Sequence, residues 1–91
     1  MIRSTHGNLK KLEEIFDEAE YTLRYELGNF HAGYCVLEDK KVVVVNRYFS
    51  LESKINTLVD ILLELDLDQS LLSDPSKQML DKIFVVQKEK A

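Results

Sequence analysis

The sequence predicts an α+β fold in the order α-β-β-β-α-α, with a three-stranded antiparallel meander packed against the helices. Three observations lead to this prediction. Apolar residues recur at steps of three and four near both ends of the chain, which is typical of helices. A stretch after the first such segment alternates with a period of two, and four valines follow one another at residues 42–45, which indicates strands.

The length supports one domain. The chain has 91 residues, of which 45% are hydrophobic, enough for a single modest core. No internal repeat, low-complexity tract or linker divides it. We therefore expect residues 1–91 to form a single domain, with mobile ends at 1–7 and 88–91.

The first helix is predicted from an apolar stripe with charged residues on its other faces. The stripe consists of Leu9, Leu12, Ile15, Phe16 and Ala19. Ser4, Thr5 and Asn8 are all possible N-caps, so the helix start is open by about one turn. The carboxylates on the outer faces are read as a solvated surface, the usual meaning of such a run.

Three strands are predicted after this helix. Tyr21 to Leu27 alternates as a half-buried strand does, and a loop from Gly28 to Gly33 leads into a strand at Tyr34 to Glu38. A tight connection at Asp39-Lys40 precedes Lys41 to Asn46, the strongest strand signal in the chain. The loop up to Gly33 is longer than a two-residue hairpin needs, and we expect the three strands to form an antiparallel meander.

The valine run predicts a strand that is apolar on both faces. Such a strand requires cover above and below, and it is not expected at a bare edge. With three helices available, one chain covers both faces only if its last helix reaches across the sheet.

Two further helices complete the order. Ser50 is a suitable N-cap for a helix over residues 51–65, whose apolar stripe is wider than a surface helix needs. Residues 66–73 form a polar connection with room for a short helical turn. Asp74-Pro75 reads as the N-cap and first residue of the last helix. Its apolar face consists of Met79, Leu80, Ile83, Phe84 and Val86.

Charge and composition exclude several classes of function. The formal net charge of −4 and the pI near 5.1 argue against a nucleic-acid-binding protein and against attraction to anionic lipid. No apolar run approaches 18 residues and no signal peptide is recognisable, so a cytoplasmic protein is expected. A single cysteine, Cys35, excludes an internal disulfide and a four-cysteine zinc site.

No catalytic, cofactor-binding or metal-binding residue is predicted. His31 and Cys35 would lie about 13 Å apart on an extended strand, too far for a nucleophile–base pair. Residues 66–70 imitate the start of a calcium loop, but Leu71 stands where glycine is required and Lys77 where a bidentate glutamate belongs. The glycines do not have phosphate-loop spacing. We expect no enzyme activity and no cofactor.

The leading functional hypothesis is a non-catalytic protein that self-associates, most simply as a homodimer, or binds another protein. Its evidence is the surplus of apolar surface on the valine strand and on the second helix. The candidate interface residues are Val42, Val44, Tyr48, Phe49, Ile61 and Leu65. Phe49 has a second interpretation, in which it packs inward just ahead of the Ser50 cap.

The alternative hypothesis is a small-ligand site or small enzyme at the loop end of the sheet. It rests on residue types that bind or react. The candidate pocket residues are Arg24, His31, Cys35, Arg47 and Tyr48.

Four segments carry a resemblance: residues 24–30, 33–35, 42–46 and 51–58. In them the chain resembles a family of short bacterial proteins without an assigned function. The strand that ends at Asn46 and the Leu-rich helix after it are also similar, more remotely, to the ImmA/IrrE-type metallopeptidase domain.

The metallopeptidase resemblance implies a shared architecture without its chemistry. That family carries a His-Glu-x-x-His helix, in which two histidines bind zinc and the glutamate acts as general base. Val59 and Leu63 stand at the two histidine positions and Asp60 at the glutamate position. Aliphatic side chains cannot bind zinc, so the resemblance implies at most a degenerate, inactive relative.

Overall fold

The computed structural model describes residues 3–27 and 33–90, with side chains described as far as Val85. It confirms an α+β fold with three helices and three strands. Two short 3₁₀ helices, η1 (Glu38–Lys40) and η2 (Gln69–Leu71), lie in the connections. The main elements are α1 (His6–Glu18), β1 (Thr22–Glu26), β2 (Tyr34–Leu37), β3 (Val42–Asn46), α2 (Leu51–Glu64) and α3 (Asp74–Lys90).

The first and last helices extend close to the described ends of the chain. α1 begins at His6 and α3 continues to Lys90, so helices include residues from both segments for which the sequence predicts mobile ends. The helical turn expected in the polar connection before the last helix is present as η2.

The predicted antiparallel meander is wrong. The sheet is mixed and has the order β1-β3-β2, in which β1 runs parallel to β3 and β2 runs antiparallel to it. β1 and β2 lie on either side of β3, two strand spacings or about 10 Å apart, a distance that the seven residues between Glu26 and Tyr34 can cover. The valine strand therefore takes the centre, where it forms ladders on both sides, as expected for a strand that is not a bare edge.

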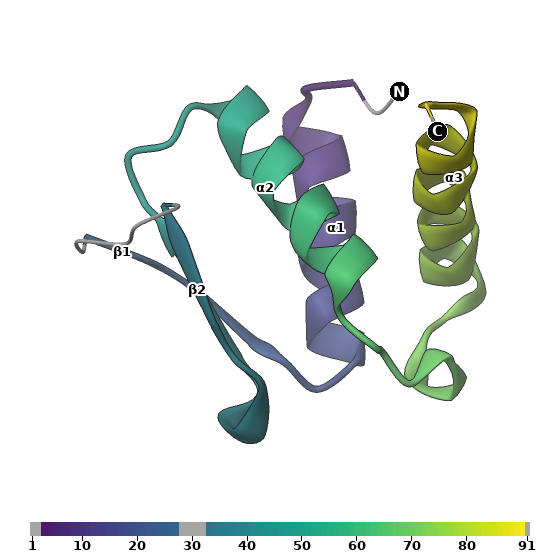
Figure 1. Ribbon diagram of the computed structural model, residues 1–91, viewed down its shortest axis with the longest axis horizontal. Helices are drawn as coiled ribbons and strands as arrows, with labels where there is room; N and C mark the ends of the chain where they lie inside the picture. Colours follow the sequence, from purple (N-terminus) through teal and green to yellow (C-terminus); the bar gives the residue numbers. More distant parts are fainter. Residues whose placement is uncertain (1–2, 28–32, 91) are drawn as a thin grey trace.

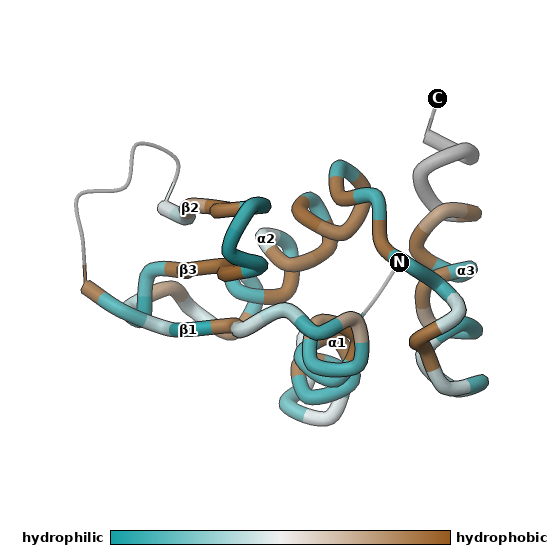
Figure 2. The backbone as a smooth tube through the Cα atoms, turned by 90° about the horizontal axis from the view of Figure 1, so that it is seen from below, coloured by the Kyte–Doolittle hydropathy of each residue, from teal (hydrophilic) through white to brown (hydrophobic). Residues whose placement is uncertain are grey.

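The helices all lie on one side of the sheet. α1 and α2 pack on one sheet face, and α3 packs on these two helices on the side away from the strands (Figures 1 and 2). The last helix thus forms a third layer and does not reach across the sheet. No part of residues 3–27 or 33–90 covers the opposite sheet face, which we call the open face.

The core lies between the sheet and the helices and continues to α3. Val43 and Val45 of β3 are fully buried against α1 and α2, and Leu80 and Ile83 of α3 extend the same cluster. Phe84, which is predicted on the apolar face of α3, is 37% exposed. The Val86 side chain lies outside the described residues. The completely buried side chains are Leu12, Ile15, Phe16, Val43, Val45, Ile55, Leu58, Ile61 and Leu62.

Side-chain caps fix the helix starts. The Asn8 N–H donates to Thr5 Oγ1 at 3.1 Å, which selects Thr5 among the three predicted caps of α1. The Ser53 N–H donates to Ser50 Oγ at 3.2 Å, as predicted for α2. At α3 the predicted cap is displaced by one residue, because Ser73 Oγ accepts from the Ser76 N–H at 3.4 Å.

A glycine and an aromatic ring close the sheet beside β2. Gly33 has a φ of +81°, and a Cβ added there would lie 2.1 Å from Phe49 Cζ. Phe49 packs partly buried against the core. Phe49 therefore packs inward, as in the second interpretation of this residue. Its ring fits there because residue 33 has no side chain.

Candidate interaction surfaces

The open face is defined by the strand register. Val42 pairs with Thr22 on one side and Leu37 on the other, and Val44 pairs with Arg24 and Cys35. Paired residues place their side chains on the same sheet face, and Val43 and Val45 point the other way, to the helices. The side chains of the open face therefore belong to Thr22, Arg24, Glu26, Cys35, Leu37, Val42, Val44 and Asn46.

The open face has an apolar centre and a charged rim. Val42 and Val44 are half-buried by their neighbours alone, Cys35 lies beside them, and Leu37 is 44% exposed. On the β1 side, Arg24 and Glu26 form an ion pair of 3.3 Å that is accessible to solvent. Such a pair contributes about 0 to 1 kcal/mol, so it leaves both groups available to other partners.

Further apolar side chains are exposed at one end of the sheet. Because β1 and β3 are parallel, the residues after their last positions, Leu27 and Tyr48, lie at the same end. Tyr48 is 73% exposed, and the Arg47 guanidinium lies 5.7 Å from the centre of its ring. The Tyr48 N–H donates to Asn46 Oδ1 at 2.9 Å, which fixes the turn that presents the ring.

The predicted ligand-pocket residues are spread over the sheet. Arg24 and Cys35 share the open face but lie on opposite sides of Val44, two strand spacings or about 10 Å apart. Arg47 packs on Tyr48 beyond the end of β3. His31 lies outside the described residues. No convergent set of polar groups is formed by the four described members.

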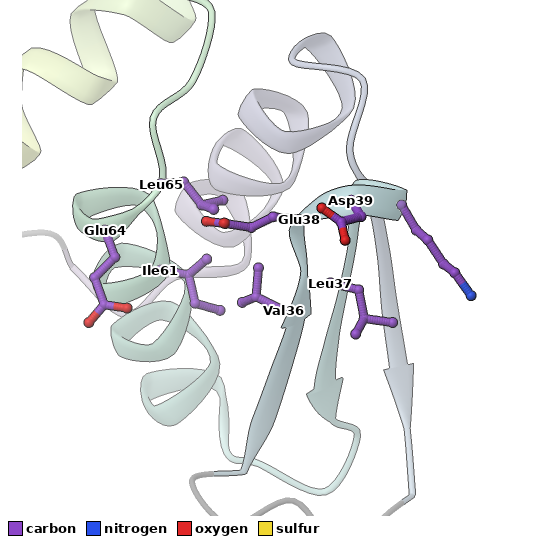
Figure 3. A pocket seen from close by; sticks show the side chains of 8 residues that line it. Val36, Leu37, Glu38, Asp39, Ile61, Glu64 and Leu65 are labelled. Atoms are coloured by element: carbon purple, nitrogen blue, oxygen red, sulfur yellow. The ribbon is translucent and has the colours of Figure 1, made fainter.

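The predicted interface residues separate into two groups. Val42 and Val44 lie on the open face and Tyr48 is exposed near its end. Ile61 of α2 and Leu65 at its C-terminal end are instead buried within the chain. Both line a cavity of about 470 Å³ beside β2 (Figure 3).

This cavity is a groove between β2 and α2, which sequence reasoning did not find. Val36 projects from β2 toward Ile61, and Glu38 lies beside Leu65 at one end (Figure 3). The lining residues are Val36, Leu37, Glu38, Asp39, Lys40, Ile61, Glu64 and Leu65. One sequence feature points to an open surface at this strand: Tyr34–Leu37 contains no charged residue, although edge strands usually carry one.

The opposite edge of the sheet, between β1 and α1, is closed by polar contacts. The Tyr25 hydroxyl donates to Glu13 Oε2 at 2.5 Å, and the Lys54 ammonium lies 5.0 Å from the centre of the Tyr25 ring. Burial raises the pKa of the Tyr25 phenol, and the hydrogen bond to Glu13 and the charge of Glu13 raise it further. The phenol therefore stays protonated and keeps its bond at neutral pH.

Comparison with protein-family models, with curated proteins and with solved structures gave no significant match. The described part of the chain contains no group of three or more His, Cys, Asp or Glu side chains placed to hold a metal ion. None of its helices combines the length and the apolar character needed to cross a membrane. The open face and the groove are the two described surfaces on which apolar side chains gather next to charged ones.

Proposed function

We propose that this chain is a non-catalytic interaction protein that forms a homodimer by packing the open face of its sheet on that of a second copy. The observation that supports the proposal is the apolar centre of this face, formed by Val42, Val44, Cys35 and Leu37, which no described helix covers. Two sheets packed face to face lie about 10 Å apart and bury such side chains between them.

The charges on the rim favour a second copy as the partner. In a two-fold dimer the same surface serves both partners, so it must tolerate its own charges. The β1 side carries one charge of each sign, at Arg24 and Glu26. A two-fold arrangement that places Arg24 opposite the partner's Glu26 replaces the exposed ion pair within each copy with two pairs across the interface.

The size of the face sets the expected affinity. Three strands about 4.8 Å apart, each about five residues long at about 3.3 Å per residue, cover about 240 Å². Stable interfaces bury about 800 Å² per partner. Even with Tyr48 and Leu27 at its end, the open face is small, so we expect a dimer that forms at micromolar or higher concentration.

Sedimentation equilibrium between about 1 μM and about 1 mM tests this proposal. The wild-type mass should rise from one chain toward two. Val44→Arg, which places a charge at the centre of the open face, should stay at one chain. Val85→Arg is a matched control, because Val85 is 53% exposed on α3 in the layer farthest from the sheet, and it should associate as the wild type does.

Two results would contradict the proposal. One is a wild-type mass of one chain throughout this concentration range. The other is a Val44→Arg variant that associates as strongly as the wild type while its circular dichroism spectrum shows the native fold.

A further inference from the structure

The outer edge of β2 offers backbone groups for another strand. The Asn46 N–H donates to the Gly33 carbonyl at 2.8 Å, and in this register Cys35 and Leu37 are the next residues bonded to β3. Because bonded and non-bonded positions alternate in an antiparallel ladder, the N–H and C=O groups of Tyr34 and Val36 point away from β3. They have no backbone partner among the described residues.

The composition of β2 leaves this edge unprotected. Edge strands usually carry charged residues or proline that prevent pairing with another chain. β2 has the sequence Tyr-Cys-Val-Leu, which contains neither. The other edge strand, β1, carries both Arg24 and Glu26. Strand addition is therefore favoured at β2.

The groove beside β2 is placed to receive the side chains of an added strand. Cross-strand neighbours share a face, so the residue opposite Val36 would point to the side of the sheet where α2 lies. There the groove of about 470 Å³ presents Val36, Ile61 and Leu65 (Figure 3). An aliphatic side chain of the added strand would bury its surface against these three residues.

The charge around the groove selects the partner. Glu38 and Asp39 follow the last residue of β2, and Glu64 lies across the groove on α2, against the single positive charge of Lys40. In antiparallel addition, the N-terminal part of the incoming strand lies beside the C-terminal end of β2. A residue two positions before the aliphatic one would therefore lie opposite Glu38.

We propose that the β2 edge and the β2–α2 groove bind an extended segment of another protein by antiparallel strand addition. The segment carries Lys or Arg, then any residue, then an aliphatic residue that fills the groove opposite Val36. The groove lies on the helix side of the sheet and shares only Leu37 with the open face, so the proposal does not depend on self-association. Backbone bonds supply affinity without sequence preference, and the groove and its carboxylates supply the specificity.

A synthetic peptide tests the backbone part of the proposal. The probe is acetyl-Ser-Lys-Thr-Ile-Thr-Val-Ser-amide with a fluorescent label, and binding is measured by fluorescence anisotropy. N-methylation at its Ile nitrogen removes a hydrogen bond to β2 and should weaken binding at least about tenfold. N-methylation at the Thr that follows, whose N–H points away from β2, is the matched control and should leave binding within about twofold.

Charge variants test the choice of partner. Glu38→Lys and Glu64→Lys should each weaken binding about threefold to tenfold at low salt, and less at high salt, where the charges are screened. Glu14→Lys makes the same change on α1 and should leave binding unchanged. A peptide with Glu in place of Lys should bind more weakly to the wild type than the probe does.

Several outcomes would overturn the proposal. They are absence of binding at about 1 mM peptide, equal weakening by the two methylations, or equal effects of Glu38→Lys and Glu14→Lys. Binding is also measured on Val44→Arg, whose open face is blocked. Retained binding supports a separate groove whatever the oligomeric state of the wild type, whereas lost binding in this folded variant would assign the peptide to the open face.

Discussion

The central strand has two faces of the same composition and opposite surroundings. Val43 and Val45 lie under α1 and α2 and are completely buried, whereas Val42 and Val44 lie on the open face with no described element over them. Four successive valines therefore serve two purposes. Two of them stabilise the fold of one chain, and the other two give the sheet an apolar surface that no described element buries.

Replacing valine by threonine on each face is the strongest test of this comparison. Thr keeps the branched shape and the strand preference of Val, so the substitution isolates the effect of a hydroxyl. Val45→Thr buries that hydroxyl in an apolar core and should lower the free energy of unfolding by about 2 kcal/mol. Val44→Thr should lower it by less than about 0.5 kcal/mol. Urea denaturation at a concentration where the chain is monomeric measures both, and equal losses would mean that the open face is covered.

Gly33→Ala tests how the helix-facing side is closed beside β2. The new methyl group would stand where the Phe49 ring packs, at a positive φ that side chains disfavour. We expect a loss of about 1 to 2 kcal/mol in urea denaturation. Gly7→Ala is the control, because a Cβ at Gly7 meets nothing closer than 4.0 Å and favours the helix. A Gly33→Ala variant as stable as the wild type would contradict the close packing of Phe49.

The elements were predictable because their signals are local. The stripe of Leu12, Ile15 and Phe16 and the Ser50 cap are each read within a few residues, and each is confirmed. The pairing of β1 was not predictable in the same way. An alternating strand fits a meander and a mixed sheet equally well, and the choice depends on which neighbour gains most from pairing with the valine strand.

The candidate surfaces were predictable to a similar extent. The unbroken valine run predicts a strand that is apolar on both faces. Val42 and Val44 do lie on the open face, away from the helices. The sequence predicts an interface on the wide stripe of α2, but α2 lies between the sheet and α3 (Figure 1), and Ile61 and Leu65 are buried within the chain. The groove combines residues as distant in sequence as Glu38 and Glu64, which only the folded chain brings together.

Tyr25→Phe tests the polar contacts at the edge of the sheet between β1 and α1. Loss of the hydroxyl removes the bond to Glu13 and should cost about 1 kcal/mol at pH 7. The pKa of Tyr25 is raised in the folded state, mainly by burial and then by Glu13. The stability gained from its neutral form is therefore complete below about pH 10, the usual pKa of tyrosine, and is lost as the pH rises above it.

Urea denaturation at pH 8 and at about pH 10.5 separates this effect from a general loss of packing. The wild type should lose more stability between the two values than Tyr25→Phe does. Tyr48→Phe is the control, because Tyr48 is largely exposed, and its pH dependence should equal that of the wild type. An identical pH dependence in Tyr25→Phe would show that the phenol is not held in its neutral form.

The smallest expected effect is at the contact that attaches α3 to α1, on the side of the core away from the sheet. Glu18 accepts hydrogen bonds from the Ser73 N–H at 2.8 Å and the Ser73 hydroxyl at 3.1 Å. The backbone bond from Ser73 is the main cause that lowers the pKa of Glu18, and it outweighs the opposing effect of partial burial. Glu18→Gln should cost less than about 1 kcal/mol at pH 7, because solvent screens the interaction.

The pH dependence of Glu18→Gln distinguishes a lost charge from a lost contact. A carboxylate with a lowered pKa stabilises the fold above its usual pKa of about 4.5, and that contribution disappears as the pH falls through the lowered value. The difference between wild type and Glu18→Gln should therefore narrow below about pH 4.5. Glu14→Gln, on an exposed position of the same helix, should show no comparable difference. If the Glu18→Gln difference stays constant down to acid pH, the contact depends on shape alone, and the charge of Glu18 has no part in holding α3 against the core.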